Sequence, residues 1–455
     1  MTGEVAVLGA GSSGLAALKA LRELGVALEC FERGSDVGGL WHYENDNGLS
    51  SAYRSLRTNA SRAHMGYPSF PLPESCGEFP HHAAMAAYLG AYADRFELRE
   101  HIRFNTTLMR LEPEHGGGWR LTFDDGHVRS FEAVVVAVGH GWCPSLPRYP
   151  GVFAGGTSHS HHYRAPERFA GRRVLVVGGG QSAAEIAVEV AAVAAYTCIS
   201  LRSGAHVIPR WLGSRPYDAG DREPRNRMPW RLMNRLYARV VASELGPLPP
   251  SWPIPSHRLL EGIPIISSDL LPAVREGAVA VRPAVERLAG DRVRFSNATE
   301  EQFDDIIYAT GYRLSLPFLA PELVSVNGRE LLLYRRIVPP EAPRGLFMAG
   351  FVDAPGGLLP IVETQAAWIA AVIDRRLALP PTEQMWRAIG RGERRSRQRF
   401  PYETPASIRC DPHAYRRLLR RDLHPLGPRP LQERKWRPPH RCRPIWPVAA
   451  GEETR

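Results

Sequence analysis

The sequence lacks paired cysteines. Six cysteines are scattered over 455 residues with no CxxC or CxxxxC spacing: Cys30, Cys76, Cys143, Cys198, Cys410 and Cys442. A zinc site or a disulfide framework is therefore not expected, and free thiols suit a reducing compartment. The missing spacing also argues against a reductase that passes electrons from a dinucleotide to a redox-active cysteine pair.

Long apolar runs are absent as well. No stretch of about 18 consecutive apolar residues occurs, so we expect no transmembrane helix. A predicted strand begins at residue 4, which leaves no room for a signal peptide. We therefore expect a cytoplasmic protein with no membrane partner, and a length of 455 residues allows two or three domains.

Lysine is nearly absent, with only Lys19 and Lys435, so arginine carries the positive charge. Residues 381–455 contain 18 Lys and Arg against 8 Asp and Glu, which accounts for the whole net charge of +10. A basic tail can bind nucleic acid or an acidic partner. This tail lacks regularly interleaved aromatic residues that would stack on bases, so we interpret it as solvated surface and expect no nucleic-acid partner.

The first thirty residues predict a dinucleotide-binding unit. A strand over 4–9 is followed by a glycine turn, a helix over 13–24 and a strand over 26–31 that ends at Glu32. The glycines of the turn are Gly9, Gly11 and Gly14. They allow a tight turn, the approach of a pyrophosphate and close helix packing, while Glu32 can accept hydrogen bonds from a ribose.

A second unit of the same kind is expected further along the chain. Its strand, helix and next strand are predicted over 173–177, 182–193 and 196–201, with a turn that carries Gly178, Gly180 and Ala183. The last strand ends at Arg202, where the first unit has an acid, and Arg210 follows. Arginine there suits a 2′-phosphate and favours NADP over NAD; a solvated surface arginine is the alternative.

The remaining pattern gives the domain organisation. Residues 102–138 predict a β-meander with strands over 107–111, 119–123 and 133–138, and prolines near 144–150 mark a linker. We expect an α/β fold with two Rossmann-like dinucleotide-binding domains, the second inserted in the first. The expected boundaries are 1–144 for the first domain, 145–302 for the second with an insertion at 211–272, 303–380 for the return, and 381–455 for the basic tail.

A further motif lies between the two units. Phe153, Gly155, His159 and Tyr163 match the pattern FxGxxxHxxxY/F. With the glycine turns and the segments Thr58-Asn59, Ala309-Thr310-Gly311-Tyr312 and Glu363-Thr364-Gln365, the chain resembles the flavin-containing monooxygenases, class B flavin-dependent monooxygenases, over about residues 4–375. Related Baeyer–Villiger monooxygenases usually have Trp where Tyr163 stands, which favours the N- and S-oxygenating branch.

The resemblance implies FAD in the first domain and NADPH in the second. In the family, a C4a-hydroperoxyflavin formed with O2 transfers one oxygen to an amine nitrogen or a sulfur. The residues that this resemblance and the two turns place at the cofactors are Gly9, Gly11, Ser13, Gly14, Glu32, Arg33, Gly39, Leu40, Trp41, Thr58, Asn59, His159, Gly178, Gly180, Gln181, Ser182, Ala183, Arg202, Ala309, Thr310, Gly311 and Gln365.

Two residues have specific expected roles. Asn59 resembles a family asparagine beside the flavin, and we predict it to be catalytic because a neutral amide donates and accepts hydrogen bonds without protonating a peroxide; a turn-forming asparagine is the alternative. For His159 the alternatives are control of the domain or NADP position and a purely structural histidine. We expect no metal at His159, His161 and His162, because no carboxylate or cysteine completes a site.

The leading hypothesis is an FAD- and NADPH-dependent monooxygenase that oxygenates an amine or a sulfide. Its partners would be a small-molecule substrate and O2, and a homodimer is a possible assembly. The alternatives are Baeyer–Villiger oxygenation of a ketone, a non-oxygenating NADPH-dependent flavin reductase, and a binding protein that uses the basic tail.

Overall fold

The computed structural model describes residues 4–220, 230–328, 330–401 and 408–426. A five-stranded parallel sheet with the order β23-β7-β1-β2-β3 lies at the centre of the first unit. Its strands are β23 (Leu346–Met348), β7 (Ala133–Val136), β1 (Val5–Leu8), β2 (Leu28–Phe31) and β3 (Ile102–Arg103). β1 is buried on both faces, which is why it is a continuous apolar run.

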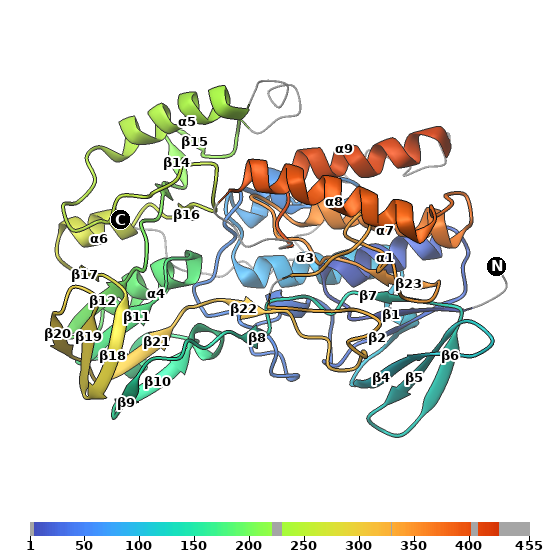
Figure 1. The fold of residues 1–455 in the computed structure, drawn as a ribbon, viewed down its shortest axis with the longest axis horizontal. Helices are drawn as coiled ribbons and strands as arrows, with labels where there is room; N and C mark the ends of the chain where they lie inside the picture. Colours follow the sequence, from blue (N-terminus) through green and yellow to red (C-terminus); the bar gives the residue numbers. More distant parts are fainter. Residues whose placement is uncertain (1–3, 221–229, 329, 402–407, 427–455) are drawn as a thin grey trace.

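Helices cover one face of this sheet, and a small antiparallel sheet covers the other (Figure 1). The helices are α1 (Ser12–Arg22), α3 (His82–Arg95) and α7 (Leu359–Ile373), and the short α2 (Arg62–Met65) contacts α7. The small sheet consists of β4 (Leu108–Pro113), β5 (Trp119–Phe123) and β6 (Val128–Phe131). The predicted meander is thus wrong in its third strand: residues 133–136 join the parallel sheet, because four fully buried residues suit its centre, and β6 takes their place.

The second unit repeats this plan. Its parallel sheet has the order β10-β21-β11-β12-β17. The strands are β10 (Gly156–His159), β21 (Asp305–Tyr308), β11 (Arg173–Val177), β12 (Tyr196–Ser200) and β17 (Val279–Arg282). α4 (Gln181–Ala191) and α6 (Leu270–Arg275) pack on one face. The opposite face packs on a sheet of β20 (Glu300–Gln302), β19 (Arg292–Phe295), β18 (Val285–Gly290) and β9 (Gly151–Phe153).

The strand pairing differs from the expected boundary at residue 303. β21 lies in the middle of the second sheet, between β10 and β11, so the chain returns to the first unit only after Tyr308. The two connections between the units pair with each other, as β8 (Cys143–Pro144) and β22 (Tyr312–Arg313). The chain therefore crosses between the units as one antiparallel pair.

The segment 211–272 forms a layer on the second unit, at the upper left of Figure 1. It contains β14 (Trp211–Leu212), β15 (Arg215–Pro216), the long helix α5 (Trp230–Leu245) and β16 (Ile265–Ile266). β16 pairs with β13 (Val207–Ile208), which joins the segment to the second unit.

The structure corrects the interpretation of residues from 381 onward as a solvated surface tail. α8 (Thr382–Arg399) and α9 (Pro412–Leu423) are helices, and both bury apolar side chains in the core of the first unit. Asp422 of α9 pairs with Arg335 at 2.6 Å and accepts a hydrogen bond from Trp368. The amphipathic spacing of Met385, Ile389, Tyr415 and Leu419 was masked in the sequence by the many arginines. Residues 427–455, the rest of the predicted tail, lie outside the described residues.

Candidate cofactor sites and active site

The first glycine turn leaves an open cradle at the start of α1. Gly9 has a φ of +97°, and a Cβ on Gly14 would overlap the carbonyl oxygen of Gly9. Gly11 caps α1, no side chain caps it, and the first turn contains no acid. The first N–H groups of α1 therefore stay without intrahelical acceptors and point at the turn, as an anion site requires. This geometry fits the pyrophosphate of a dinucleotide.

Glu32 shapes this cradle from the end of β2. Its carboxylate accepts hydrogen bonds from the backbone nitrogens of Ala10 and Gly34, each at 2.7 Å, and is buried. Arg33 beside it is exposed. Glu32 Oε1 also accepts from Asn47 Nδ2 at 3.4 Å, so Oε2 is the oxygen that keeps a second lone pair for a ribose hydroxyl.

The predicted loop at Gly39, Leu40 and Trp41 also lies at this turn. It forms a 3-10 turn, and a Cβ on Gly39 would lie 3.1 Å from the Cα of Gly11. Leu40 is 44% exposed although it is large and apolar. Two glycine backbones therefore face each other here, with an exposed leucine at the edge.

Ser13 is buried against Gly350, a residue that the sequence analysis did not select. Gly350 has a φ of +79°, and a Cβ there would overlap Ser13 Oγ. The only signal in the sequence is that Gly350 ends a short apolar strand, β23.

Gln365 does not lie at the cofactor surface. Its side chain is fully buried and accepts from the Gly350 nitrogen at 2.9 Å, while its Nε2 donates to the Tyr415 hydroxyl at 2.8 Å. Both ends of the amide are therefore engaged inside the core. This position contradicts the expected cofactor contact and gives Gln365 the role of joining α7, α9 and Gly350.

The second glycine turn has the same design at α4. Gly178 has a φ of +147°, and a Cβ there would overlap the carbonyl oxygen of Ala309. Gly180 caps α4 without any side-chain cap or acid in the first turn, and Ala183 is fully buried at the close-packing position. Ser182 lies half-buried in the first turn of α4. The free N–H groups of α4 again fit a pyrophosphate.

The side chain of Gln181 is committed to the protein rather than open to a ligand. Its amide exchanges two hydrogen bonds of 2.8 Å with the backbone of Ile266 and donates a third, at 2.7 Å, to Glu185. The side chain is therefore engaged by the protein, and the predicted cofactor contact of Gln181 stays a prediction that its backbone N–H at the start of α4 can fulfil. Gln181 fastens β16 of the 211–272 segment to α4.

Two arginines were candidates for a 2′-phosphate, and the structure separates them. Arg202, at the end of β12, is exposed, and no carboxylate pairs with it in the described parts of the chain. Arg210 is largely buried and pairs with Glu185 at 2.7 Å. Arg202 alone is free to meet a phosphate.

Asn59 is exposed between two buried neighbours. Thr58 is buried and its hydroxyl donates to the carbonyl of Ala60 at 2.8 Å. No hydrogen bond involves the Asn59 side chain within the residues that the structure describes. The hydroxyl of Thr58 thus anchors the loop, and the side-chain amide of Asn59 is exposed at its surface.

The loop that carries Asn59 is tied to α4. The Tyr53 hydroxyl donates to Glu185 of α4, and the same carboxylate accepts from Arg210 and Gln181. Burial raises the pKa of Tyr53 well above its ordinary value, so the hydroxyl keeps its proton. The Asn59 loop and the helix that follows the second glycine turn are therefore held by one carboxylate, an arrangement without a signal in the sequence.

A second tie comes from the 211–272 segment. The Ser61 nitrogen donates to Asp218 Oδ2 at 2.8 Å, and a ring nitrogen of His64 lies 3.1 Å from the Asp218 carbonyl oxygen. Asp218 of the segment therefore lies beside the loop that carries Asn59.

The FxGxxxHxxxY stretch is an edge of the second sheet rather than a free linker. A Cβ on Gly155 would overlap the Asp304 carbonyl oxygen, which explains glycine at this position. His159 is buried, and its Nδ1 accepts from the His161 nitrogen at 3.0 Å. Burial lowers the pKa of His159 to about 4, so its ring is neutral at neutral pH.

His159 also packs against the crossing between the units. Its ring meets that of Tyr312 edge-to-face at 5.4 Å, and the Thr310 hydroxyl donates to the Ser145 carbonyl at 2.5 Å. The Ser145 nitrogen donates to the Gly311 carbonyl. Thr310 and Gly311 therefore join the two crossings, and Ala309 lies against Gly178 of the second turn.

Comparisons with known proteins agree with this geometry. The family model for flavin-binding monooxygenase-like proteins matches residues 2–419. The chain belongs to this family. It is 32% identical to flavin-containing monooxygenase 3 of Macaca mulatta, with 90% of this chain and 80% of that protein covered. It is 33% identical to dimethylaniline monooxygenase [N-oxide-forming] 2 of Cavia porcellus, with 87% and 78% covered.

A solved structure shows the same fold. S-allyl-L-cysteine S-oxygenase from Allium sativum superposes with a TM-score of 0.71 at 24% identity, covering 93% of this chain and 89% of that one. The predicted fold class and family resemblance are thus confirmed. This flavin-binding monooxygenase-like protein is an NADPH-dependent monooxygenase whose cofactors are FAD and NADPH.

Two features are absent from the described residues. No helix of the described residues is long and apolar enough to cross a membrane. Within the same residues, no three His, Cys, Asp or Glu side chains lie close enough together to ligate a metal ion.

Proposed function

We propose that this monooxygenase transfers one oxygen atom of O2 to a soft nucleophile, the nitrogen of an amine or the sulfur of a sulfide. The observation that carries the proposal is the exposed Asn59 amide on a loop that Tyr53 and Glu185 tie to the second glycine turn. A neutral amide at this place can donate to an oxygen and accept from a ribose hydroxyl without titrating. Names of relatives support the same chemistry, since one is N-oxide-forming and another is an S-oxygenase.

Each cofactor has a site of its own in this proposal. The first turn, Glu32 and Arg33 would bind the dinucleotide part of FAD, and the second turn with Arg202 would bind NADPH, its 2′-phosphate at Arg202. Bound FAD, once reduced by NADPH, supplies the activation of O2. The protein binds and orients both cofactors, and the 211–272 segment, fastened through Asp218 and by Gln181, holds the Asn59 loop in place.

His159 serves as a positioning residue in this scheme. It is neutral, buried and packed on Tyr312, so proton transfer from it is not part of the reaction. Its proposed role is to fix the crossing between the two units. Cytoplasmic location and a homodimer stay predictions, which fractionation and light scattering would test.

The experiment is a comparison of substrates with the purified FAD-loaded protein. Amines and thioethers should increase NADPH consumption and yield N-oxides or S-oxides in near equal amount to the NADPH consumed. Cyclic ketones should be oxidised at least about tenfold more slowly. Lactone formation at a faster rate would establish Baeyer–Villiger oxygenation instead. NADPH consumption with no oxygenated product from any class would indicate a flavin reductase.

A further inference from the structure

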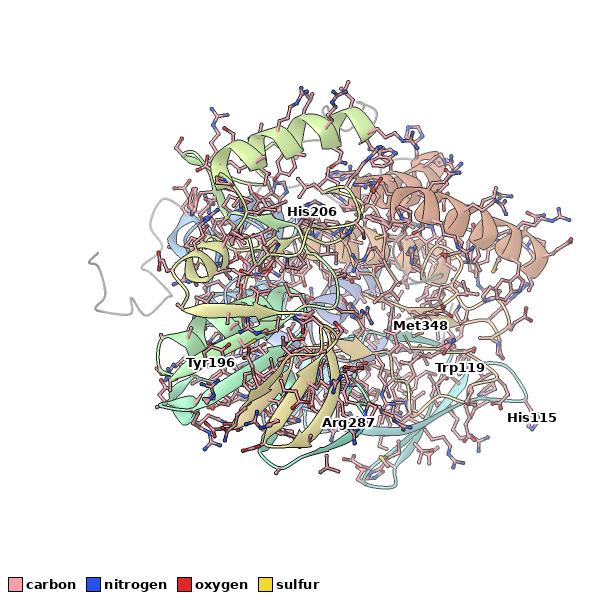
Figure 2. The ribbon with its side chains drawn as sticks, turned by 60° about the vertical axis from the view of Figure 1, so that its left-hand side comes forward. His115, Trp119, Tyr196, His206, Arg287 and Met348 are labelled. Atoms are coloured by element: carbon pink, nitrogen blue, oxygen red, sulfur yellow. The ribbon has the colours of Figure 1, made fainter. Side chains whose placement is uncertain are left out.

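The helix α5 covers a groove that no cofactor residue lines. α5 has 16 residues, but of these only Asn234 and Val241 are buried, so most of the helix stands away from the body. Beneath it lies a groove of about 950 Å³. Figure 2 shows His206, one of its lining residues, below this helix. The size falls within the range of about 300–1,000 Å³ that is typical of ligand sites.

The wall of the groove is mostly apolar. Val207, Val241, Leu245, Leu248 and Leu259 contribute to it. Its polar groups are engaged with the protein: a ring nitrogen of His206 lies 2.6 Å from the His257 carbonyl oxygen, and Asn234 Oδ1 accepts from the Leu260 nitrogen at 3.1 Å. The inner surface therefore suits a hydrocarbon chain.

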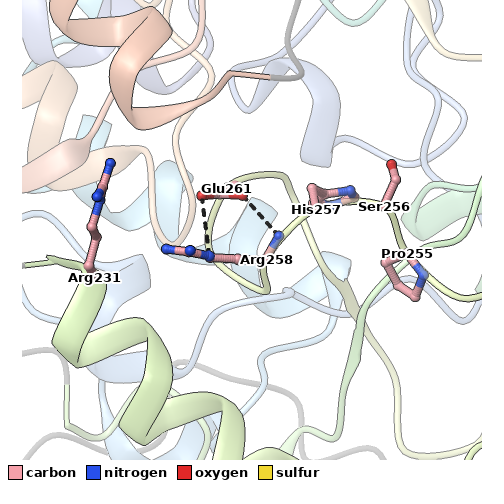
Figure 3. A pocket seen from close by; sticks show the side chains of 6 residues that line it. All are labelled: Arg231, Pro255, Ser256, His257, Arg258 and Glu261. Atoms are coloured by element: carbon pink, nitrogen blue, oxygen red, sulfur yellow. Dashed lines mark hydrogen bonds and ion pairs between the residues drawn. The ribbon is translucent and has the colours of Figure 1, made fainter.

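The mouth of the groove is positively charged. Arg231, Arg235 and Arg239 lie on successive turns of α5, and Arg258 faces them from the loop below. Arg231 and Arg258 also line an adjoining pocket of about 430 Å³, where they lie on either side of open space (Figure 3). Glu261 accepts a hydrogen bond from the backbone nitrogen of Arg258 at 2.9 Å, and its other carboxylate oxygen lies 4.0 Å from Nε of the Arg258 guanidinium. For the arginines of α5, the described residues provide no carboxylate within ion-pair distance.

We propose that this groove binds a single-chain amphiphile with a carboxylate head, such as a long-chain fatty acid anion. The chain would lie beneath α5, and the carboxylate would lie between Arg231 and Arg258. The planar guanidinium is suited to carboxylate. The arginines of α5 have no carboxylate within ion-pair distance among the described residues, so at the mouth of an apolar groove they complement an anion rather than an amine. The site is independent of oxygenation, because it shares no residue with the two glycine turns or the Asn59 loop.

Calorimetry with the FAD-loaded protein tests the ligand class. Dodecanoate below its micellar concentration should bind at one site per chain. Each buried CH2 group should tighten binding about fourfold, so dodecanoate should bind about 15-fold more tightly than decanoate. Dodecanol should bind about tenfold more weakly than dodecanoate, and dodecyltrimethylammonium more weakly still, because both lack the anionic head.

Variants distinguish the contribution of the ligand's carboxylate head group from that of its hydrocarbon chain. The double variant Arg231→Gln, Arg258→Gln should weaken dodecanoate about tenfold and leave dodecanol unchanged. Ala242→Trp, which adds bulk at the groove surface, should weaken both ligands. Arg287→Gln, at an exposed arginine on β18 far from the groove (Figure 2), is the matched control and should change neither.

Three outcomes would overturn the proposal. The first is no saturable binding of dodecanoate, and the second is equal affinity in the double variant. The third is binding to vesicles of anionic phospholipid through the arginines of α5 while monomeric dodecanoate does not bind. That result would assign this face to a membrane surface instead.

Discussion

The hydroxyl of Tyr53 donates a hydrogen bond to Glu185, and this bond joins the loop of the predicted catalytic residue to the helix of the predicted NADP site. The same carboxylate is held by Arg210 and Gln181. A displacement of α4 is therefore expected to displace the loop that carries Asn59. The second glycine turn and the Asn59 loop are connected through this hydrogen bond.

Removing this bond should impair the coupling between NADPH oxidation and product formation. In Tyr53→Phe, Glu185 keeps its other partners, so we expect a loss of stability of only about 1 kcal/mol. We expect the share of NADPH consumed without product to rise several-fold, measured as hydrogen peroxide released per NADPH. Tyr149→Phe, at a half-buried tyrosine of the second unit, is the control; an equal rise there would refute the positioning role of Tyr53.

Replacing Asn59 should leave FAD bound but abolish most oxygenation. The side chain has no partner within the described residues, so Asn59→Ala removes no contact that stabilises the fold. We expect unchanged flavin content and thermal midpoint, and product formation reduced at least about tenfold while NADPH oxidation continues. Unchanged product yield per NADPH would exclude Asn59 from the active site.

Arg202→Ala should discriminate between the two nicotinamide cofactors. The exposed guanidinium is expected to meet the 2′-phosphate, which NADH lacks. KM for NADPH should therefore rise at least about tenfold, and KM for NADH should change less than about twofold. Arg287→Ala should change neither constant, and equal effects of Arg202→Ala on both cofactors would contradict the assignment.

Mild acid should destabilise the protein partly through His159. Burial lowers the pKa of its folded form to about 4, whereas an unfolded histidine titrates near 6.5. Between these values only the unfolded chain binds the proton, so stability falls as the pH decreases from about 6.5 to 4 and is unaffected above this range.

The variant His159→Gln isolates that contribution. Its loss of unfolding free energy between pH 7.5 and 5 should be about 1–2 kcal/mol smaller than that of the unmodified chain. His82→Gln is the control, because burial also lowers the pKa of His82 to about 4. This variant should still show the loss of stability in acid that His159 causes. Parallel pH curves for the unmodified chain and His159→Gln would show that His159 does not contribute.

Gly155→Ala should damage the edge of the second sheet. The new methyl group would overlap the Asp304 carbonyl oxygen and press on the ring of Phe153, which we expect to cost about 1–3 kcal/mol in unfolding free energy. Gly116→Ala is the control, since nothing lies within 4 Å of a Cβ there. Equal melting temperatures of the two variants would contradict this explanation of the motif.

Local patterns were sufficient to predict both glycine turns. At Gly9 and Gly178 the positive φ is a local requirement for glycine, and the glycine, the preceding apolar strand and the following helix are contiguous in sequence. The same is true of Glu32, which directly follows β2. The sequence alone is therefore sufficient to predict these positions.

Residues whose role depends on distant contacts could not be assigned. Gln181 and Gln365 have polar side chains at plausible positions, but their partners, Ile266 and Tyr415, lie 85 and 50 residues away. Tyr53 and Glu185 are 132 residues apart. The position of strand β21 could not be predicted either. Its place between β10 and β11 depends on strand pairing, which the hydrophobic periodicity of the sequence does not reveal.

The position of β21 has a consequence for the order in which the protein can assemble during synthesis. All five strands of the second sheet have left the ribosome once Tyr308 has emerged. The first sheet still lacks β23, which ends at Met348, and its core is completed by α9, which ends at Leu423. The first unit, which contains the N-terminal strand, is therefore the last to be completely synthesised. It remains incomplete while the inserted second unit can already fold.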